Sequence, residues 1–398
     1  MGIWWKICVL LALRDVAGID VTLVRVKLYL MECMAILGRR EEPTDGVQDY
    51  CSYLRDGLAN EGVNLTLVQV RWAEIGREAS RRELLEAIKS KQNTFFLLQY
   101  TALSWSRRGF ALPAVGILKL LRKNGARCAV VFHDPDGYAG NRTVDRFRRG
   151  IQRYAMKRLV RLSDLVIFTL PRDKISWLPA ETQNFVFIPV GANLPAPERT
   201  WEEKRSSTGS KPVVAIFSLS DKPTLVKEVS QIARAVSIAA KQVGALEVVV
   251  LGRNSEAGGE ELRLALAGSL AEVRILGLIS GDEVVRVLGV SDVMLFARGP
   301  ISSRRGSAIA GVACGLPVIA AEGSETTPPI TEAGVDLVPE ELVPDGFGAA
   351  LVRILTDQAY RASLAERSRN AQSRYFSWSV IARQYTQALR AVEAPSRK

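Results

Sequence analysis

The chain has 398 residues, which suggests two or three domains and excludes a single small one, since domains average roughly 150 residues. Its composition, 47% hydrophobic and 24% charged, excludes a disordered or fibrous protein. Lysine and arginine number 53 against 42 acidic residues. The resulting formal charge of +11 favours an anionic partner such as a phosphate-rich metabolite, a nucleic acid or an acidic membrane surface.

His133 is the only histidine, and this excludes multi-histidine metal sites. Any Ser-His-Asp or Cys-His catalytic site would depend on the same residue. The five cysteines are odd in number, far apart and without a C-x-x-C pair. That usage is typical of a reduced cytosolic protein.

Residues 1–30 do not follow the pattern of the rest of the chain. Their apolar run, residues 7–13, is much shorter than the roughly 20 residues that cross a bilayer, and no A-x-A cleavage site accompanies it. An interfacial amphipathic anchor is one interpretation. We favour the other, that the native chain starts at Met31 or Met34, directly before the first convincing strand.

From residue 31 onward, short apolar runs alternate with longer helical segments, which indicates parallel strands joined by crossover helices. The first expected strands are 34–37, 65–70, 94–99, 128–132, 165–169 and 184–189. The helices expected between them are 46–61, 81–90, 110–124 and 143–162. These elements predict a doubly wound α/β domain over residues 31–195.

Residues 196–212 are polar and rich in proline, serine and charge, so they predict a linker. The alternation then restarts, with expected strands over 213–217, 246–251, 273–276, 293–296 and 317–320. The expected helices are 225–242, 258–268, 281–288 and 306–314, with a largely helical segment over 347–392. We expect a second Rossmann-like domain over residues 213–375, then a final amphipathic helix and tail over 376–398.

Several motifs of other enzyme classes are missing from the sequence. No G-x-G-x-x-G follows a strand, and there is neither a Walker lysine motif nor an H-E-x-x-H. The sequence therefore does not indicate a dinucleotide oxidoreductase, a P-loop NTPase or a zinc protease. In open parallel sheets ligands bind outside the carboxyl ends of the strands. Two such domains face to face would form a cleft, and its strand-to-helix loops should hold the functional residues.

Two loops of the first domain hold candidate residues. Asp45 and Gly46 follow the first strand, where Asp45 can cap a helix and Gly46 lets the backbone approach a phosphate. An ordinary capped turn is the alternative. His133 and Asp134 follow the fourth strand, where a neutral imidazole can donate to a sugar hydroxyl or to developing negative charge. A surface or core histidine is the alternative there.

Two further features of this domain have both a functional and a plain interpretation. Tyr100 opens a strand-end segment with Trp105 that suits a saccharide or base face, although aromatics at a helix start also serve the core. The helix expected over 143–162 carries basic residues at helical spacing, Arg146, Arg149, Arg153, Lys157 and Arg161. A solvated face explains them, and an anionic membrane surface is the sharper interpretation. Nucleic-acid binding gains little support.

In the second domain the informative stretch is SSRRGSAIAGVACGLPVIA, residues 302–320. Arg304 and Arg305 precede Gly306 and Ser307, which open a small-residue helix whose free amide groups could hold a diphosphate. A helix packed closely on the sheet is the alternative, and both can hold. Lys222, after the first strand of this domain, could also reach a phosphate; a solvated lysine at a helix start is the alternative.

Four segments, in order, resemble the C-terminal domain of one enzyme family: GLISGDEVVRVLGVSDVMLFA, GVACGLPVIAAEG, EAGVDLVP and FSWSVIARQYTQAL. The family is the retaining nucleotide-sugar glycosyltransferases of the GT-B fold, family four. LGRREEPTDGVQDYCSYLRDGLANEGV and VVFHD resemble its acceptor-side N-terminal domain. The resemblance implies two Rossmann-like domains facing across a cleft, with the donor on the second domain and a C-terminal helix crossing back to the first.

The same resemblance implies sugar transfer from a nucleoside diphosphate donor with retained configuration, no cofactor and no essential metal. Arginine, lysine and a helix N-terminus would then stabilise the leaving diphosphate. One departure matters. Family members carry paired glutamates where this chain has Ser302 and Ala310, and an arginine where it has Ser218. In the family the second glutamate holds the donor ribose, so its loss puts nucleotide recognition in doubt and suggests a rearranged phosphate site.

We therefore expect a cytoplasmic glycosyltransferase, peripheral on the inner face of the membrane, with a lipid-linked or polysaccharide acceptor and no nucleic-acid partner. His133 would lie near the transferred sugar, approached by Asp45 and Gly46, with Asp134 and Tyr100 at the cleft. The diphosphate would meet Arg304, Arg305, Gly306, Ser307 and Lys222. A non-catalytic nucleotide-sugar-binding relative and a UDP-sugar epimerase are the alternatives.

Overall fold

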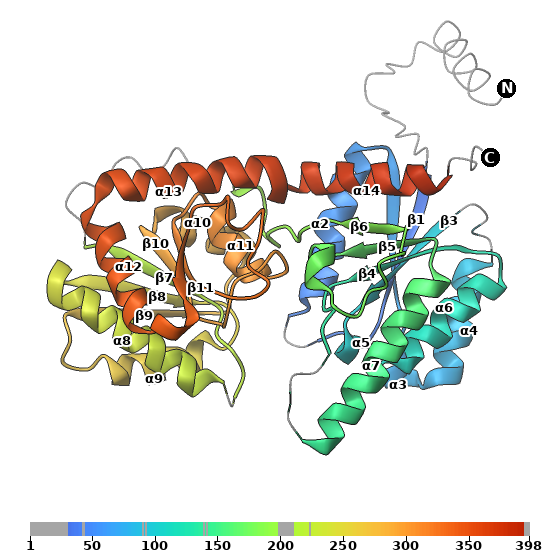
Figure 1. Cartoon of the computed structure of the whole chain (residues 1–398), viewed down its shortest axis with the longest axis horizontal. Helices are drawn as coiled ribbons and strands as arrows, with labels where there is room; N and C mark the ends of the chain where they lie inside the picture. The colour runs from blue at the N-terminus through green and yellow to red at the C-terminus, as the bar shows by residue number, and fades with distance from the viewer. Residues whose placement is uncertain are drawn as a thin grey trace, which may run out of the picture.

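The computed structural model describes residues 31–41, 44–89, 91, 94–137, 140, 142–197, 211–222 and 224–393. The extension expected over residues 1–30 and most of the linker expected over 196–212 lie outside these residues. The described chain forms two α/β units, each with helices on both faces of a parallel sheet (Figure 1). The predicted fold class is confirmed.

The first sheet has the strand order β2-β1-β3-β4-β5-β6, and all its pairings are parallel. The strands are β1 (Met31–Leu37), β2 (Val63–Gln69), β3 (Thr94–Tyr100), β4 (Arg127–Phe132), β5 (Leu165–Phe168) and β6 (Phe185–Phe187). The helices are α2 (Gly46–Asn60), α3 (Trp72–Ile75), α4 (Arg77–Ile88), α5 (Ala102–Trp105), α6 (Leu112–Lys123) and α7 (Thr143–Leu162). β3 is buried along its whole length, as its continuous apolar run TFFLLQY predicts for a strand covered on both faces.

The second sheet has the order β12-β11-β10-β7-β8-β9, again parallel. Its strands are β7 (Val213–Phe217), β8 (Leu246–Leu251), β9 (Ala271–Gly277), β10 (Val293–Phe296), β11 (Val318–Glu322) and β12 (Val335–Pro339). Its helices are α8 (Leu225–Val243), α9 (Ser255–Ala265), α10 (Gly281–Val290), α11 (Gly306–Ala313), α12 (Asp345–Thr356) and α13 (Gln358–Ala371). The chain reverses its direction of winding between β1 and β3 in one sheet and between β7 and β10 in the other.

One feature of the second unit differs from the sequence expectation. β12 was not predicted, because Asp336 interrupts its short apolar run; that buried carboxylate accepts a hydrogen bond from Arg353 over 2.6 Å. The segment over 347–392 is largely helical, as expected, and its final helix is separate from those before it. The segment divides into α12, α13, a π-helical turn over Gln372–Phe376, and α14 (Trp378–Glu393).

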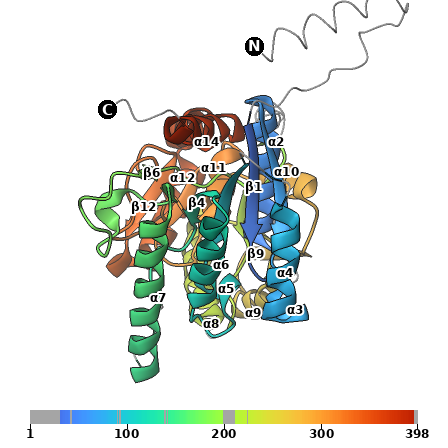
Figure 2. The ribbon, with the colours of Figure 1, turned by 90° about the vertical axis from the view of Figure 1, so that its right-hand side faces the viewer.

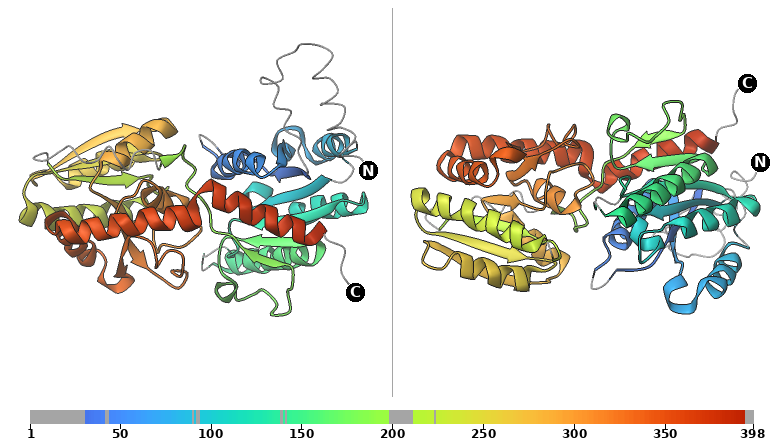
Figure 3. Two further views of the ribbon diagram at one scale, coloured as in Figure 1. Left: turned by 90° about the horizontal axis from the view of Figure 1, so that it is seen from above. Right: turned by 60° about the horizontal axis from the view of Figure 1, so that its bottom comes forward.

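The final helix α14 leaves the second unit and lies along the first, beside α2 (Figures 1 and 3). Trp378 donates from its indole nitrogen to the Ala192 carbonyl over 2.7 Å. Gly57 of α2 permits the approach, since a Cβ there would lie 2.9 Å from the Trp378 carbonyl oxygen. The predicted C-terminal crossover helix is therefore confirmed.

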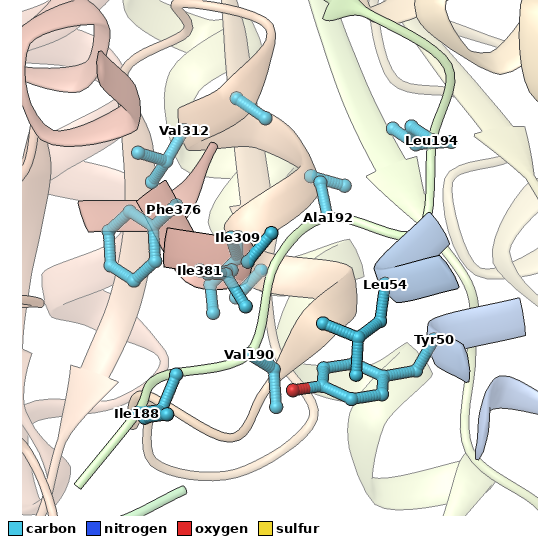
Figure 4. Close-up of a cluster of buried hydrophobic side chains, with 14 of the residues drawn as sticks. Tyr50, Leu54, Ile188, Val190, Ala192, Leu194, Ile309, Val312, Phe376 and Ile381 are labelled. Carbon is cyan, nitrogen blue, oxygen red and sulfur yellow. The ribbon is translucent and has the colours of Figure 1, made fainter. Parts of the chain in front are cut away.

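A shared apolar core joins the two units beneath the gap between them (Figure 4). It contains side chains of α2, of the segment 188–194, of α11 and of the chain around α14: Tyr50, Leu54, Ile188, Val190, Ala192, Leu194, Ile309, Val312, Phe376 and Ile381. Burial of such side chains stabilises by roughly 1.5–3 kcal/mol each. The relative placement of the units is therefore held by packing as well as by the covalent connection.

Candidate active site in the cleft between the domains

A cavity of about 590 Å³ lies between the two sheets. Its walls come from the loops after β1, β3 and β4 on one side and after β7, β8, β9 and β10 on the other. Both reversal points, β1 with β3 and β7 with β10, therefore open into it. This is where open parallel sheets bind ligands, and it agrees with the expected cleft of strand-to-helix loops.

Most of the residues predicted for the site line this cavity: His133, Asp134, Asp45, Gly46, Arg304, Arg305, Gly306 and Ser307. Tyr100 and Lys222 do not. Tyr100 is buried in the first core with its ring centroid 5.1 Å from that of Phe132, and Lys222 is exposed to solvent. Trp105 is also wholly buried and donates to the Gln99 carbonyl over 2.8 Å, so the core interpretation of that segment is the correct one.

The His133 imidazole is fixed by a buried glutamine. Its Nε2 lies 2.8 Å from Oε1 of Gln99, whose amide nitrogen donates to the Leu97 carbonyl. Since an amide oxygen can only accept, the imidazole proton is on Nε2 and Nδ1 has the lone pair. Burial lowers the pKa of His133 to about 4, so the ring is neutral near pH 7. The sequence predicts an imidazole that donates to a ligand, whereas in this arrangement Nε2 donates to Gln99 and Nδ1 can only accept.

The C-terminal helix supports the wall that holds His133. The Tyr50 ring meets the imidazole edge-on, with 4.9 Å between ring centroids. The Tyr50 hydroxyl lies 2.9 Å from that of Tyr385 in α14, and both rings are buried. Burial raises the pKa of both phenols, so both remain protonated. A contact made by the last helix thus reaches the proposed site through one aromatic ring.

Asp45 is used as a helix cap. Its carboxylate accepts hydrogen bonds from the backbone amides of Glu41, Val47 and Gln48 at 3.0, 2.9 and 3.0 Å. This satisfies the free amides at the start of α2 and orders the loop before it. Gly46 follows with open space around it, since a Cβ there would come no closer than 4.0 Å to Asn193.

Arg304 is already occupied by three carboxylates. It lies 3.1 Å from Asp134 and 2.9 Å from Asp136, both in the first unit, and 2.9 Å from Glu325 in the second. The sequence-based expectation that Arg304 grips a diphosphate therefore requires these ion pairs to break. Arg304 instead ties the two walls of the cavity together.

Two of the acids around Arg304 have pKa values shifted in opposite directions. Burial and the hydrogen bond to Glu325 raise the pKa of Asp136 to about 7. Burial opposes ionisation of Glu325, but hydrogen bonds from Arg304 and Asp136 outweigh it and lower its pKa to about 2. The negative charge is therefore concentrated on Glu325, next to the guanidinium.

Arg305 and Arg298 are the guanidinium groups most available to an anion in the cavity. Burial lowers the pKa of both, and neither forms an ion pair with any residue that the structure describes. The Nε of Arg305 is buried without a hydrogen-bond partner there. Such desolvated cations are attractive to a phosphate, because a bound anion would restore the solvation they lost on folding.

Sequence reasoning missed Arg298 and Arg253, which also lines the cavity. Arg253 crosses to the first unit, where it donates to the Thr44 hydroxyl over 2.8 Å and lies 3.4 Å from Glu41. Each arginine is the second residue after a strand, β8 for Arg253 and β10 for Arg298. That position at a strand end, already visible in the expected strands, was the signal that could have found them.

The departures from the family pattern occur at the cavity. Ala310 and Ser218 line it, and Ser302 is buried behind it. Ser218 has a left-handed backbone conformation, with φ of 63°. None of the three supplies a carboxylate or a guanidinium. The second unit offers an anion Arg253, Arg298 and Arg305 instead, together with the N-terminus of α11.

Acidic and sulfur ligands are not arranged for a metal ion in the described part of the chain. No group of three or more His, Cys, Asp or Glu side chains there could hold one. Asp134, Asp136 and Glu325 are close together, but they surround a guanidinium.

Comparison with known proteins agrees with the fold. The profile of the family described as Glycosyl transferases group 1 matches residues 212–357. No curated protein matches the chain in sequence. Sucrose-phosphate synthase from Thermosynechococcus elongatus superposes with a TM-score of 0.64 at 18% identity, covering 91% of this chain and 99% of that one.

Two further structures have the same architecture. Anabaena HepE, solved in complex with UDP and glucose, has a TM-score of 0.61 at 13% identity and covers 91% of this chain and 100% of its own. UDP-GlcNAc 2-epimerase from Neisseria meningitidis, bound to UDP-GlcNAc, has a TM-score of 0.54 at 10% identity, with coverage of 91% and 100%. The chain thus has the GT-B fold, and its second domain matches the profile of the group 1 glycosyltransferases.

Proposed function

We propose that the protein transfers a sugar from a nucleoside diphosphate donor to a lipid-linked or polysaccharide acceptor with retention of configuration. The observation that carries the proposal is the wall of the cavity opposite His133. It holds two arginines without ion-pair partners among the described residues, together with the N-terminus of α11. Arg298, Arg305, Gly306 and Ser307 line the second-domain wall, and His133 lines the first-domain wall. A leaving diphosphate needs such positive groups, and a sugar between the walls would lie beside the imidazole.

The chemistry assigned to these groups is simple. The bond between sugar C1 and the diphosphate oxygen breaks, and its electron pair passes to the diphosphate. The acceptor hydroxyl oxygen bonds to C1 from the face that the leaving group vacates, and its proton passes to the departing phosphate. Arg298 and Arg305 would stabilise the charge that develops, and Nδ1 of His133 would accept a hydrogen bond from a sugar hydroxyl.

The acceptor and the cellular setting belong to the same proposal. The charge of +11 supports an acceptor presented at an anionic surface. No helix in the described part of the chain is long and apolar enough to cross a bilayer. We place the activity in the cytoplasm, peripheral to the inner face of the membrane, in the synthesis of cell-surface glycans. No cofactor, essential metal or nucleic acid has a role in the proposed reaction.

Donor binding tests the proposal directly. Calorimetric titration of the full chain with UDP-, GDP- and ADP-sugars should give saturable binding to members of one nucleotide class. Folded protein that binds none of them would overturn the donor assignment. Product formed with a purified acceptor should be lost in His133→Ala, while nucleotide binding is retained.

Two alternatives have specific observations in their favour. Ala310 leaves that wall without a carboxylate, as in a protein that binds a nucleotide sugar without transferring it. Asp134 and Asp136 place two carboxyl groups close together at the cleft, as an epimerase would need. Release of free nucleoside diphosphate that depends on acceptor would exclude both, whereas conversion of the donor sugar without acceptor would identify an epimerase.

A further inference from the structure

The most distinctive surface outside the cleft is the first half of α7. This helix extends past the rest of the first domain as a free-standing end (Figure 2). Its inner face, with Gln152, Met156 and Leu159, is buried, and Gln152 donates to the Gly109 carbonyl over 2.9 Å. The opposite face of the first half of the helix is largely exposed to solvent.

That outer face combines cations with large apolar side chains. Phe147 is 65% exposed, Tyr154 58% and Val144 49%, although such residues usually seek burial. Arg146 and Arg153 stand next to the two rings, one position before each, and are exposed. Phe147 and Tyr154 are seven residues apart, so they lie on one side of the helix two turns from each other.

No acidic group neutralises this face. Arg146 and Arg153 form no ion pair with any residue that the structure describes, and neither does Arg161 farther along. The one carboxylate on the first turns, Asp145, is buried; it accepts from the Arg142 amide and pairs with Arg148. The face therefore has a single sign of charge.

The apolar surface continues from α7 toward the cavity. The Phe147 ring lies 6.2 Å from that of Phe110, between centroids, in the turn between α5 and α6. Arg107 is exposed in this turn, Leu103 of α5 and Leu112 of α6 are exposed on either side of it, and Leu103 also lines the cavity. We call the exposed residues of this surface the α7 patch: Leu103, Arg107, Arg108, Leu112, Val144, Arg146, Phe147, Arg153 and Tyr154.

We infer that the α7 patch docks the protein on an anionic lipid bilayer, with Val144 and Phe147 entering the headgroup boundary and the arginines meeting lipid phosphates. Basic residues flanking exposed aromatic and aliphatic side chains are the composition of interfacial helices. The arginines could also bind the phosphates of a nucleic acid, but Val144, Leu103 and Leu112 would then have no role. Because the patch reaches Leu103, a docked molecule would have one edge of its cavity at the membrane, where a lipid-linked acceptor is held.

This inference rests on the proposed function only in naming a lipid-linked acceptor. Binding to vesicles is measured without donor or acceptor, so its failure and the failure of sugar transfer are separate results. The test uses the full chain, co-sedimented with vesicles of phosphatidylcholine alone or mixed equally with phosphatidylglycerol, at low and high salt. Binding should require phosphatidylglycerol and weaken with salt.

The decisive variant is the double charge reversal Arg146→Glu/Arg153→Glu. One cation near an anionic surface contributes about fivefold in affinity, so removing two should weaken vesicle binding by about 30-fold or more. The matched control, Lys241→Glu/Arg383→Glu, changes net charge equally on exposed positions of α8 and α14, away from the patch. It should bind within about threefold of the natural protein. Equal loss in both variants would overturn the assignment to α7.

The apolar part of the patch has its own variant. Phe147→Ala/Tyr154→Ala should weaken binding while leaving its salt dependence unchanged, because no charge is removed. Both side chains are exposed, so melting temperatures of all three double variants should match that of the natural protein. Absence of vesicle binding by the folded natural protein would overturn the inference, as would tighter binding to a single-stranded oligonucleotide that Arg146→Glu/Arg153→Glu abolishes.

Discussion

Arg304 in the second domain donates from Nη1 to Oδ1 of Asp134 in the first domain over 3.1 Å, directly across the edge of the proposed active site. The same guanidinium also reaches Asp136, at 2.9 Å. Arg253 makes the corresponding crossing at another part of the cavity, to Thr44 and Glu41. Polar contacts from both second-domain loops therefore hold the domains together around the cleft, above the shared apolar core.

Replacing Arg304 with alanine should be costly. Asp134, Asp136 and Glu325 would remain close together without their shared cation, and they are partly solvated, so we expect a loss of about 2 kcal/mol in the free energy of unfolding. Urea denaturation checks this. The control is Arg234→Ala, which removes a solvent-exposed pair with Asp345 and should lower the free energy of unfolding far less. Similar losses in the two variants would show that the ion pairs of Arg304 stabilise the fold no more than an exposed ion pair does.

His133 should not titrate near neutral pH. It is the chain's single histidine, so protein labelled with ¹⁵N-histidine will give one pair of imidazole resonances. We expect the neutral Nε2–H tautomer, with no change between about pH 5 and 8. In Gln99→Glu the facing carboxylate should raise the pKa of the imidazole, bringing a titration into that range. Titration of the unsubstituted protein with a midpoint near 6.5 would contradict the buried, glutamine-bound arrangement.

The same residue should make stability depend on pH. The pKa of His133 is about 4 when folded and 6.5 in its ordinary state, so the unfolded chain binds more protons between these values. The contribution of His133 is therefore present above pH 6.5 and lost as pH falls toward 4, by on the order of 3 kcal/mol. The raised pKa of Asp136 acts in the opposite direction. Comparing the unfolding free energies of the natural protein and His133→Gln across this range cancels the Asp136 effect and isolates the histidine.

The buried pair Tyr50 and Tyr385 gives a test of coupling between α14 and the cleft. Either single change to phenylalanine leaves the other hydroxyl buried without its partner and should cost about 1–3 kcal/mol. The double change removes both groups and should cost less than the two single changes added together. A double-mutant cycle of unfolding free energies measures the difference. Strict additivity would mean that the 2.9 Å contact contributes nothing.

Nucleotide binding should depend on arginines that the sequence reasoning did not select. Arg298→Ala should weaken binding of a nucleoside diphosphate by about 10- to 100-fold, the contribution of a charge-assisted hydrogen bond. Lys222→Ala is the matched control, since that side chain is exposed and does not line the cavity, and it should bind as the natural protein does. Calorimetry decides between them. A larger effect at Lys222 would place the diphosphate in the β7 loop.

Much of the fold could be predicted from the sequence because its elements are local. Continuous apolar runs such as TFFLLQY indicate strands buried on both faces, and α8 and α14 show their amphipathic spacing directly. β12 could not be predicted, because the ion pair between Asp336 and Arg353 that makes its central carboxylate acceptable joins residues in different elements. The separate final helix could be predicted, because its apolar residues recur at helical spacing from residue 380 onward.

The chain length predicts two domains, and the structure has two α/β units. The single histidine, His133, lines the cavity between them. By itself the sequence determined the two parallel α/β units, the strand-end loops that line the cavity and the one imidazole among them. These features can be read from periodicity and position along the chain, without knowing which residues meet in the folded protein. Only the tertiary structure decided which charges remain available. Arg304 is neutralised by Asp134, Asp136 and Glu325, Asp45 is used as a cap, and Arg298 remains without an ion pair among the described residues. Those outcomes depend on side chains meeting across two domains, and such long-range pairing leaves no periodic signal in the sequence.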